Sequence, residues 1–286
     1  MSKPHDRSGL EELLVAADGE DTDQVSVVAA AALAGAAPLR VTVLSVADPA
    51  DHDRRRALLS ASIDAVGLEA TVTVAPGDVV DTLLHQARST PGRWLCLTSQ
   101  GRGPFGDLLA GSITEAVVAS STVPVVIIGP RADASRLAGD GPVLVSISPG
   151  DDPTALEAAR ILAAHLGTGL ELVGVVSPEE RVEIDEVPAT DSPAAGARQQ
   201  LQGLADALPD AGVGQVGVRV LHGAEVADTL AHLAEETGAA AVVMASHGVS
   251  GLRRLLRGSH TLRMAALAPC AVVSVRVHGP EAEWSG

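Results

Sequence analysis

Aromatic residues are nearly missing from this sequence of 286 residues, which has two Trp, one Phe and no Tyr. Hydrophobic residues still make up 46% of it, so its cores must be packed mainly with Val, Leu, Ile and Ala. Apolar runs of about 18 residues are also missing, so a membrane span is not expected. The N-terminal stretch MSKPHDRSGLEELL lacks the apolar region of a secretory signal. These absences predict a globular protein of the cytoplasm.

Positive charge and cysteine are scarce as well. The 20 Lys and Arg residues face 36 Asp and Glu residues, which gives a formal net charge of −16. A nucleic-acid partner is therefore not expected, because binding to a phosphate backbone needs a clustered basic surface. Cys96 and Cys270 are far apart in apolar runs and form no CxxC motif. We predict two buried, free thiols in a reducing compartment.

A repeated spacing of small residues organises the chain. The stretch LTSQGRGPFGDLLAGS aligns with MASHGVSGLRRLLRGS, and both contain Gly-x9-Gly-Ser. Gly101 falls on Gly248 and Gly111 on Gly258, a constant offset of 147 residues. Upstream, VAPGDVVDTLLHQA matches VLHGAEVADTLAHL, and downstream PVVIIGPR matches AVVSVR. These ordered matches indicate two copies of one unit of about 140 residues.

We predict two domains, at residues 10–131 and 141–278, joined by a polar, glycine-containing linker. Each alternates continuous Val/Leu/Ile runs, which are typical of parallel strands covered on both faces, with helical periods. This alternation predicts a doubly wound α/β sheet in each copy. The segment 177–200 breaks the match and is expected to be a lid or a surface loop without a counterpart. The predicted strands are 13–17, 41–46, 71–74, 94–97 and 124–128, then 143–148, 170–176, 216–220, 240–244 and 271–276.

The Gly-x9-Gly-Ser spacing has two interpretations. Ligands of doubly wound sheets sit outside the carboxyl ends of the strands, which is where TSQG and ASHG are expected. Glycine lets the backbone approach a ligand, and a helix that begins at Gly-Ser offers N–H groups to an anion. Together these elements could hold a ribose and a phosphate chain. The alternative is architectural: glycines in turns, and a serine that caps its helix.

The stretch ASHG-x9-GS, which follows VVM and precedes a helix and APCAVVSVR, resembles the signature of the universal stress protein family. The resemblance covers essentially the whole chain, and the tandem arrangement is similar to that of the two-domain members. It implies two tandem Rossmann-like (adenine nucleotide alpha hydrolase-like) domains, each with a doubly wound five-stranded parallel sheet. It also implies association through the last strand, as a pseudo-dimer within the chain or a homodimer. Many members bind ATP, which implies ATP here, with Mg²⁺ as its possible companion.

The resemblance also implies nucleotide contacts at the strand ends. The aspartate that contacts adenosine after the first strand matches Asp18, but Ser148 stands at that place in the second copy. A serine cannot supply the same charged acceptor. Val46 and Val175 match the residue that packs beside the adenine.

The fourth-strand loop carries the remaining expected contacts. Its first glycine is replaced by Thr98 and Ala245, and β-branched Thr98 could crowd a ribose. His247 could reach a phosphate, although its counterpart Gln100 supports no shared acid–base role. The loop and phosphate positions implied are Gly101, Gly111, Ser112, Ile113 and Thr114 in the first copy and Gly248, Gly258, Ser259, His260 and Thr261 in the second.

No catalytic constellation stands out. The places of the SGGxDS-like loop found in ATP pyrophosphatases of similar architecture read ADGEDTD and SISPGDD, and no metal-ligand spacing occurs. The sequence therefore predicts a protein that binds ATP in one or both domains and regulates a stress response, with at most slow ATP hydrolysis. The competing hypothesis is a nucleotide-free, dimerising interaction module.

Overall fold

Strands and helices alternate along the chain in the order that the sequence predicts. The computed structural model describes residues 9–18, 24–99, 112–148, 153–176, 193–208, 212–247 and 254–277. The first unit contains β1 (Glu12–Ala16), α1 (Gln24–Ala36), β2 (Arg40–Val46), η2 (Pro49–Asp51), α2 (His52–Val66), β3 (Thr71–Ala75), α3 (Val79–Arg88), β4 (Arg93–Thr98), α4 (Ser112–Ser120) and β5 (Val125–Ile128). The connection contains η3 (Ala134–Ala138). The second unit contains β6 (Val143–Ser146), α5 (Thr154–Leu166), β7 (Leu170–Val176), α6 (Pro193–Ala207), β8 (Val216–His222), α7 (Val226–Glu236), β9 (Ala241–His247), α8 (Arg254–Leu267) and β10 (Ala271–Val277).

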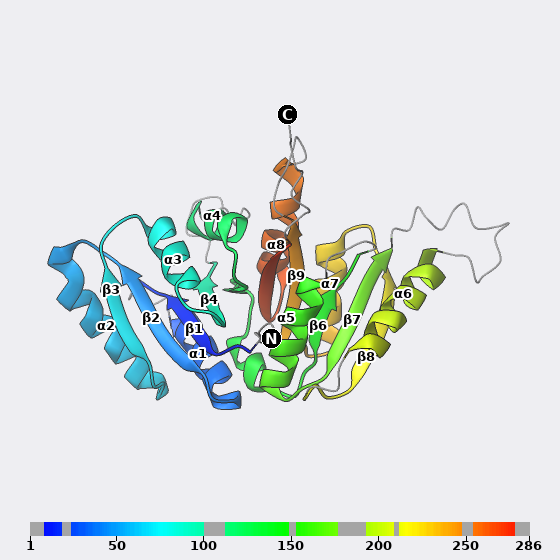
Figure 1. The fold of residues 1–286 in the computed structure, drawn as a ribbon, viewed down its shortest axis with the longest axis horizontal. Coiled ribbons are helices and arrows are strands. Elements are labelled where there is room, and N and C mark those ends of the chain that lie inside the picture. Colours follow the sequence, from blue (N-terminus) through cyan, green and yellow to red (C-terminus); the bar gives the residue numbers. More distant parts are fainter. Residues whose placement is uncertain are drawn as a thin grey trace, which may run out of the picture.

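The ten strands form one continuous sheet across the molecule, in the order β3-β2-β1-β4-β5-β10-β9-β6-β7-β8 (Figure 1). Neighbouring strands within each unit are parallel, as in the pair of β1 with β2 and the pair of β6 with β7. The predicted α/β class, with two doubly wound five-stranded parallel sheets, is confirmed. None of the helices in the described ranges is long and apolar enough to cross a membrane.

The two units join where β5 and β10 pair in antiparallel fashion. Val126 lies opposite Val273, flanked by the pairs Val125–Ser274 and Ile127–Val272. Val126 and Val273 are separated by the offset of 147 residues that relates the two copies in the sequence. Equivalent residues therefore face each other, as they must where a local twofold axis passes through a self-complementary interface. The chain thus forms a pseudo-dimer through its two last strands.

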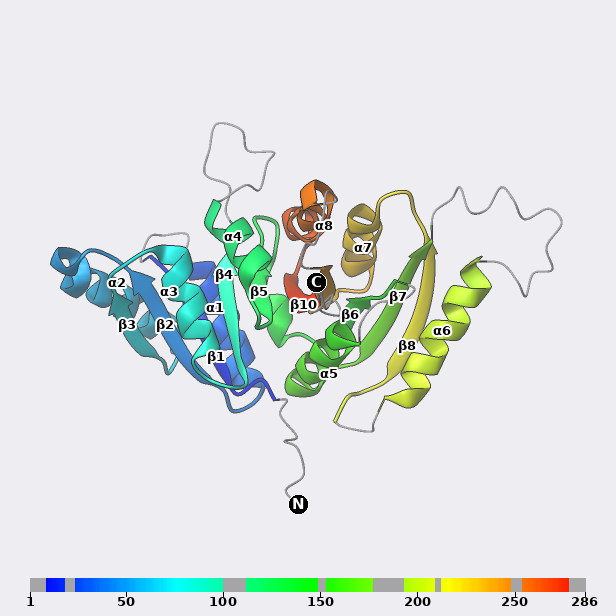
Figure 2. The ribbon, with the colours of Figure 1, turned by 45° about the horizontal axis from the view of Figure 1, so that its top comes forward.

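Helices cover both faces of the sheet and bury two apolar layers (Figure 2). One layer contains residues of α1, α2, α5 and α6, and the other contains residues of α3, α4, α7 and α8. Successive strand residues point to opposite layers, so that Leu13 and Val15 enter the first and Leu14 the second. Valine, leucine, isoleucine and alanine dominate both layers, as the lack of aromatic residues predicts.

Two connecting segments contain more structure than the sequence predicts. The connection over 131–141 is more than a polar spacer, because Ala134 and Leu137 of η3 are buried and η3 packs against α1. In addition, the last third of the segment 177–200 has a counterpart. Helix α6 begins at Pro193 and lies between β7 and β8, as α2 lies between β2 and β3. The sequence pattern of α6 is weakly apolar, and Leu201 is its one fully buried residue. Residues 177–192 lie outside the described residues.

Candidate functional site

The order of strands in the first unit reverses between β1 and β4. The chain runs from β1 outward through β2 to β3, and then returns to β4 on the other side of β1. Ligands of doubly wound sheets bind outside the carboxyl ends of the strands at such a switch point. The edge beyond β1 and β4 is therefore the candidate site of this unit.

Three of the residues predicted from the sequence end or follow adjacent strands at this edge. Val15 of β1 pairs with Cys96 of β4, so the chain leaves both strands side by side. Asp18 follows β1 and is exposed, whereas Thr98 ends β4 and is partly buried. Val46 ends the neighbouring strand β2 and is also partly buried. A carboxylate, a hydroxyl and an aliphatic side chain thus come from three adjacent strands.

Helix α4 begins at Ser112, as the Gly-Ser spacing predicts. Ile113 is 43% exposed and Thr114 only 6% exposed, so the first turn presents an isoleucine side chain to solvent and directs its threonine inward. The first N–H groups of a helix have no partner within it and carry positive partial charge, which suits an anion. Gly101 and Gly111 lie outside the described residues, and the side chain of Ser112 is not described.

The second unit differs at the equivalent edge. Ser148 follows β6 and is exposed, and Val175 is partly buried near the end of β7. Ala245 and His247 were expected in a loop, but they belong to β9, which pairs with β10 as far as His247–Val277. Strand β9 extends this far because its partner β10 is long: β10 has seven residues, whereas β5 in the first unit has four. Gly248 lies outside the described residues.

Helix α8 also departs from the expectation that it opens at Gly258-Ser259. It begins at Arg254, so Gly258 and Ser259 lie inside the helix, where their N–H groups belong to its own hydrogen-bond ladder. RLLR precedes Gly258 where the first copy has DLLA, and arginine is a better helix former than aspartate. His260 is exposed and Thr261 is 1% exposed. The N–H groups of Gly258 and Ser259 are therefore not at the start of α8, where the sequence analysis placed them.

Helix α4 is supported by a contact from the other unit that the sequence did not predict. Arg276 of β10 donates from its guanidinium to the carbonyl oxygen of Ala119 in the last turn of α4, at 3.0 Å. An arginine at a helix C-terminus satisfies a free carbonyl and opposes its negative partial charge. The helix with the candidate anion site in one unit is therefore held by the other unit. An arginine at the end of an apolar strand was the one signal available.

The chain has two buried thiols and a buried serine hydroxyl, of which Cys96 and Ser45 lie near the first site. Burial raises the pKa of the Cys96 thiol, in β4 beside the site, to about 12, and raises that of Cys270 equally. Both cysteines are free and buried, which confirms the prediction and excludes a thiolate nucleophile at neutral pH. Among the described residues, the hydroxyl of Ser45 is buried without a hydrogen-bond partner, one position before Val46. Sequence reasoning missed this serine, although it stands in an otherwise apolar strand end.

Comparison with known proteins agrees with this architecture. A sequence model of the Universal stress protein family matches residues 10–129 and again residues 141–276. A universal stress protein from Archaeoglobus fulgidus matches 93% of this chain and 98% of its own, with a TM-score of 0.67 and 20% identity. A protein of unknown function from Pseudomonas aeruginosa matches 93% and 92%, with a TM-score of 0.63 and 15% identity. The cytoplasmic domain of a prokaryotic cation chloride cotransporter matches 92% and 94%, with a TM-score of 0.52 and 13% identity.

At these identities the structural likeness shows the fold alone, and the family is shown by the sequence match. That match spans most of the chain in two consecutive segments, which agrees with the internal repeat and with the two halves of the sheet. The chain therefore belongs to the universal stress protein family, with two copies of the family unit in tandem.

Proposed function

We propose that this protein binds ATP at the carboxyl edge of its first domain and acts in the cytoplasm as a nucleotide-dependent regulator of a stress response. The observation that carries the proposal is the placement of Asp18, Val46 and Thr98 at the ends of three adjacent strands beside the switch point. The domains are taken as residues 10–131 and 141–278.

Each group at this edge has a role that suits part of a nucleotide. The exposed carboxylate of Asp18 can accept hydrogen bonds from ribose hydroxyls, because an ionised carboxylate acts only as an acceptor. The aliphatic side chain of Val46 can pack against the adenine ring. The N–H groups that begin α4 at Ser112 can receive the phosphates.

A divalent cation would arrive with the nucleotide. Among the described residues there is no cluster of three His, Cys, Asp or Glu side chains that could hold a metal ion. Mg²⁺ commonly keeps several waters and binds through substrate phosphates with one or two carboxylates. Asp18 carries an exposed carboxylate at the end of β1 that could share such an ion with the phosphates. The ion would neutralise part of the triphosphate charge, which matters on a chain with a net charge of −16.

The second domain lacks two of these features. Ser148 replaces the aspartate, and α8 begins at Arg254 rather than at Gly258. We therefore propose one ATP per chain, in the first domain. Regulation would follow if ATP binds two conformations unequally, since a ligand shifts only an equilibrium between states that it distinguishes. The bond from Arg276 to α4 offers a route by which the second domain could respond.

Purification without added nucleotide provides the test. The protein is denatured, and any released adenine nucleotide is identified by chromatography with mass detection. About one ATP per chain is expected. If none is released and a titration with ATP and Mg²⁺ gives no binding, the proposal is wrong and the protein is better described as a nucleotide-free interaction module.

A further inference from the structure

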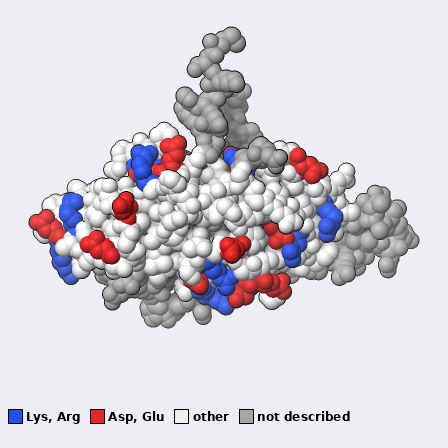
Figure 3. Space-filling view, turned by 90° about the horizontal axis from the view of Figure 1, so that it is seen from below, with Lys and Arg blue, Asp and Glu red and all other residues white. Residues whose placement is uncertain are grey.

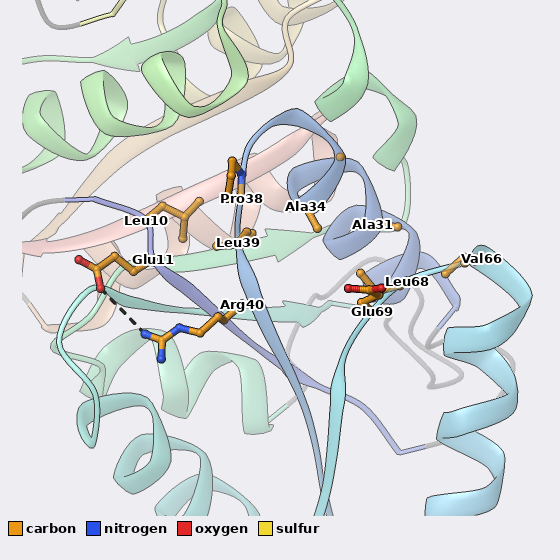
Figure 4. Close-up of a pocket in the computed structure, with 12 residues that line it drawn as sticks. Leu10, Glu11, Ala31, Ala34, Pro38, Leu39, Arg40, Val66, Leu68 and Glu69 are labelled. Carbon is orange, nitrogen blue, oxygen red and sulfur yellow. Dashed lines mark ion pairs between the residues drawn. The ribbon is translucent and has the colours of Figure 1, made fainter.

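A cavity of about 790 Å³ lies at the opposite edge of the first sheet, where β1 and β2 begin (Figure 4). Its size is that of a small-molecule site, which typically measures about 300–1,000 Å³. The cavity is formed by the end of α1, the residues at the starts of β1 and β2, and the turn after α2. It is thus separate from the carboxyl edge at which ATP is proposed to bind.

Most of the lining is aliphatic. Leu10, Leu39 and Leu68 contribute side chains from three different segments. Helix α1 contributes Ala31 and Ala34, so no large side chain of this helix fills the space. Figure 4 shows these alanines between Leu10 on one side and Leu68 on the other. Such walls would accept the apolar body of a ligand.

The polar part of the lining is acidic. Glu11 and Glu69 line the cavity and are exposed, and the single cationic lining residue, Arg40, lies 3.9 Å from carboxylate oxygens of both Glu11 and the buried Glu12. Helices α1 and α2 both end at this edge, and helix C-termini carry negative partial charge. The charge of Arg40 is therefore engaged, and the remaining field favours a cation.

At the equivalent edge of the second domain, the loop before β8 lies against α5 and the start of β7. The buried positions of α1 and α5 match at an offset of 129 residues, as in the pair Leu33 and Leu162, so Ala164 occupies the position of Gly35, which also lines the cavity. A β-carbon built on Gly212 would lie only 3.9 Å from the Cβ of Ala164. The same loop donates a hydrogen bond from the Gly214 N–H to the Thr168 carbonyl oxygen, at 3.0 Å. The described residues at the two edges therefore pack differently, and the cavity belongs to the arrangement of the first domain.

We propose that this cavity binds a small amphipathic organic cation. Its apolar body would lie against Leu10, Leu39 and Leu68, and its ammonium or amidinium head would face Glu69 and the ends of α1 and α2. The same turn of α1 is bonded to the second domain, because the ring of His165 donates from Nε2 to the Leu33 carbonyl oxygen at 2.8 Å. Occupancy of the cavity would therefore act on a turn that contacts both domains.

The test uses three probes with one apolar body: n-hexylammonium, 1-hexanol and hexanoate. Each is titrated into the full-length protein, and the methyl signals of its leucines are followed by NMR. We expect saturable binding of n-hexylammonium with shifts at Leu10, Leu39 and Leu68. Hexanol should bind about fivefold more weakly and hexanoate more weakly still, because partly exposed charges contribute up to about 1 kcal/mol. No saturable shift, or equal affinity for all three probes, would overturn the proposal.

Two variants and a control separate the cavity from nonspecific effects. Ala34→Leu should fill the cavity and weaken n-hexylammonium at least tenfold, because packed interiors leave little room for adjustment. Leucine is nearly as good a helix former as alanine, so α1 should persist. Glu69→Gln should weaken n-hexylammonium severalfold and leave hexanol unchanged. Ala61→Leu, at an exposed position of α2 that does not line the cavity, should change neither; unchanged binding in Ala34→Leu would contradict the proposal.

Discussion

The two domains share one framework and differ at both edges of their sheets. At the carboxyl edge, the first has Asp18 and a helix that begins at Ser112, and the second has Ser148 and a helix that begins at Arg254. At the amino edge, the first has an open cavity, and in the second the loop before β8 is hydrogen-bonded to Thr168. The strands and the interface are kept while the edges diverge. A duplicated unit can thus retain its assembly and assign different tasks to its halves.

The same contrast occurs inside the sheet. Glu12 of β1 is buried and its carboxylate accepts from the Arg93 guanidinium at 2.7 Å and from the Thr42 hydroxyl at 3.0 Å. By the offsets that relate the two copies, the places of Glu12 and Arg93 are taken in the second domain by Pro142 and Ala240. An ion pair in one domain is therefore an apolar contact in the other.

Breaking the shared interface should have the largest effect. Val126 is 1% exposed and lies on the local twofold axis, so Val126→Asp would bury an unpaired carboxylate between β5 and β10. We expect a loss of at least about 4 kcal/mol in the free energy of unfolding, measured with urea. Thr71→Asp, at an exposed position of the edge strand β3, is the control and should change little. Equal effects of the two substitutions would show that the interface contributes little stability.

Removing the ion pair that one domain has and the other lacks should come next. Glu12→Val leaves Arg93 without its carboxylate in a nearly buried site and should cost about 3 kcal/mol. The double variant Glu12→Val/Arg93→Leu, which makes the pair apolar as in the second domain, should recover most of this loss. Both are measured by urea unfolding. If the double variant is as unstable as Glu12→Val alone, the apolar exchange inferred from the second domain does not hold.

Each domain also contributes one buried thiol, which predicts an effect of alkaline pH. The folded-state pKa of Cys96 and Cys270 is raised to about 12, so their stabilising contribution is complete below the ordinary thiol pKa and is lost as pH rises above it. Two thiols should cost about 3 kcal/mol between pH 8 and pH 10. The chain has no Tyr and Lys3 is its single lysine, so few other groups titrate in this range.

Unfolding free energies at several pH values between 8 and 10 measure this slope. Cys96→Ala and Cys270→Ala should each remove about half of it, and the double variant should be nearly flat. The comparison uses the slope, because each substitution also changes packing. A slope that survives in the double variant would mean that other groups cause the alkaline loss of stability.

Much of the framework is predictable from the sequence because it depends on local patterns. Continuous apolar runs locate the strands, and the offset of 147 residues identifies Val126 and Val273 as the pair on the twofold axis. The start of α8 and the length of β9 are not predictable from the loop motif. They depend on the helix formers before Gly258 and on a partner strand, β10, that extends to Val277.

Contacts between distant segments could also not be predicted from the sequence. The bond from Arg276 to α4 joins residues of different domains, and no local pattern reports it. The amino-edge cavity arises because the turn after α2 is short and α1 presents Ala31 and Ala34. In sequence these alanines are indistinguishable from those that pack elsewhere on the same helix. The expected nucleotide residues Asp18, Val46 and Thr98 do end or follow adjacent strands, because parallel strands bring their carboxyl ends to one edge.

The most direct test of the central claim is a calorimetric titration of ATP with Mg²⁺ into protein freed of nucleotide. The account predicts about one site per chain, binding at least about tenfold weaker in Asp18→Asn because a charged hydrogen bond is lost, and no change in Ser148→Ala. Two equivalent sites per chain, or a loss of affinity in Ser148→Ala with none in Asp18→Asn, would contradict the assignment of the nucleotide to the first domain.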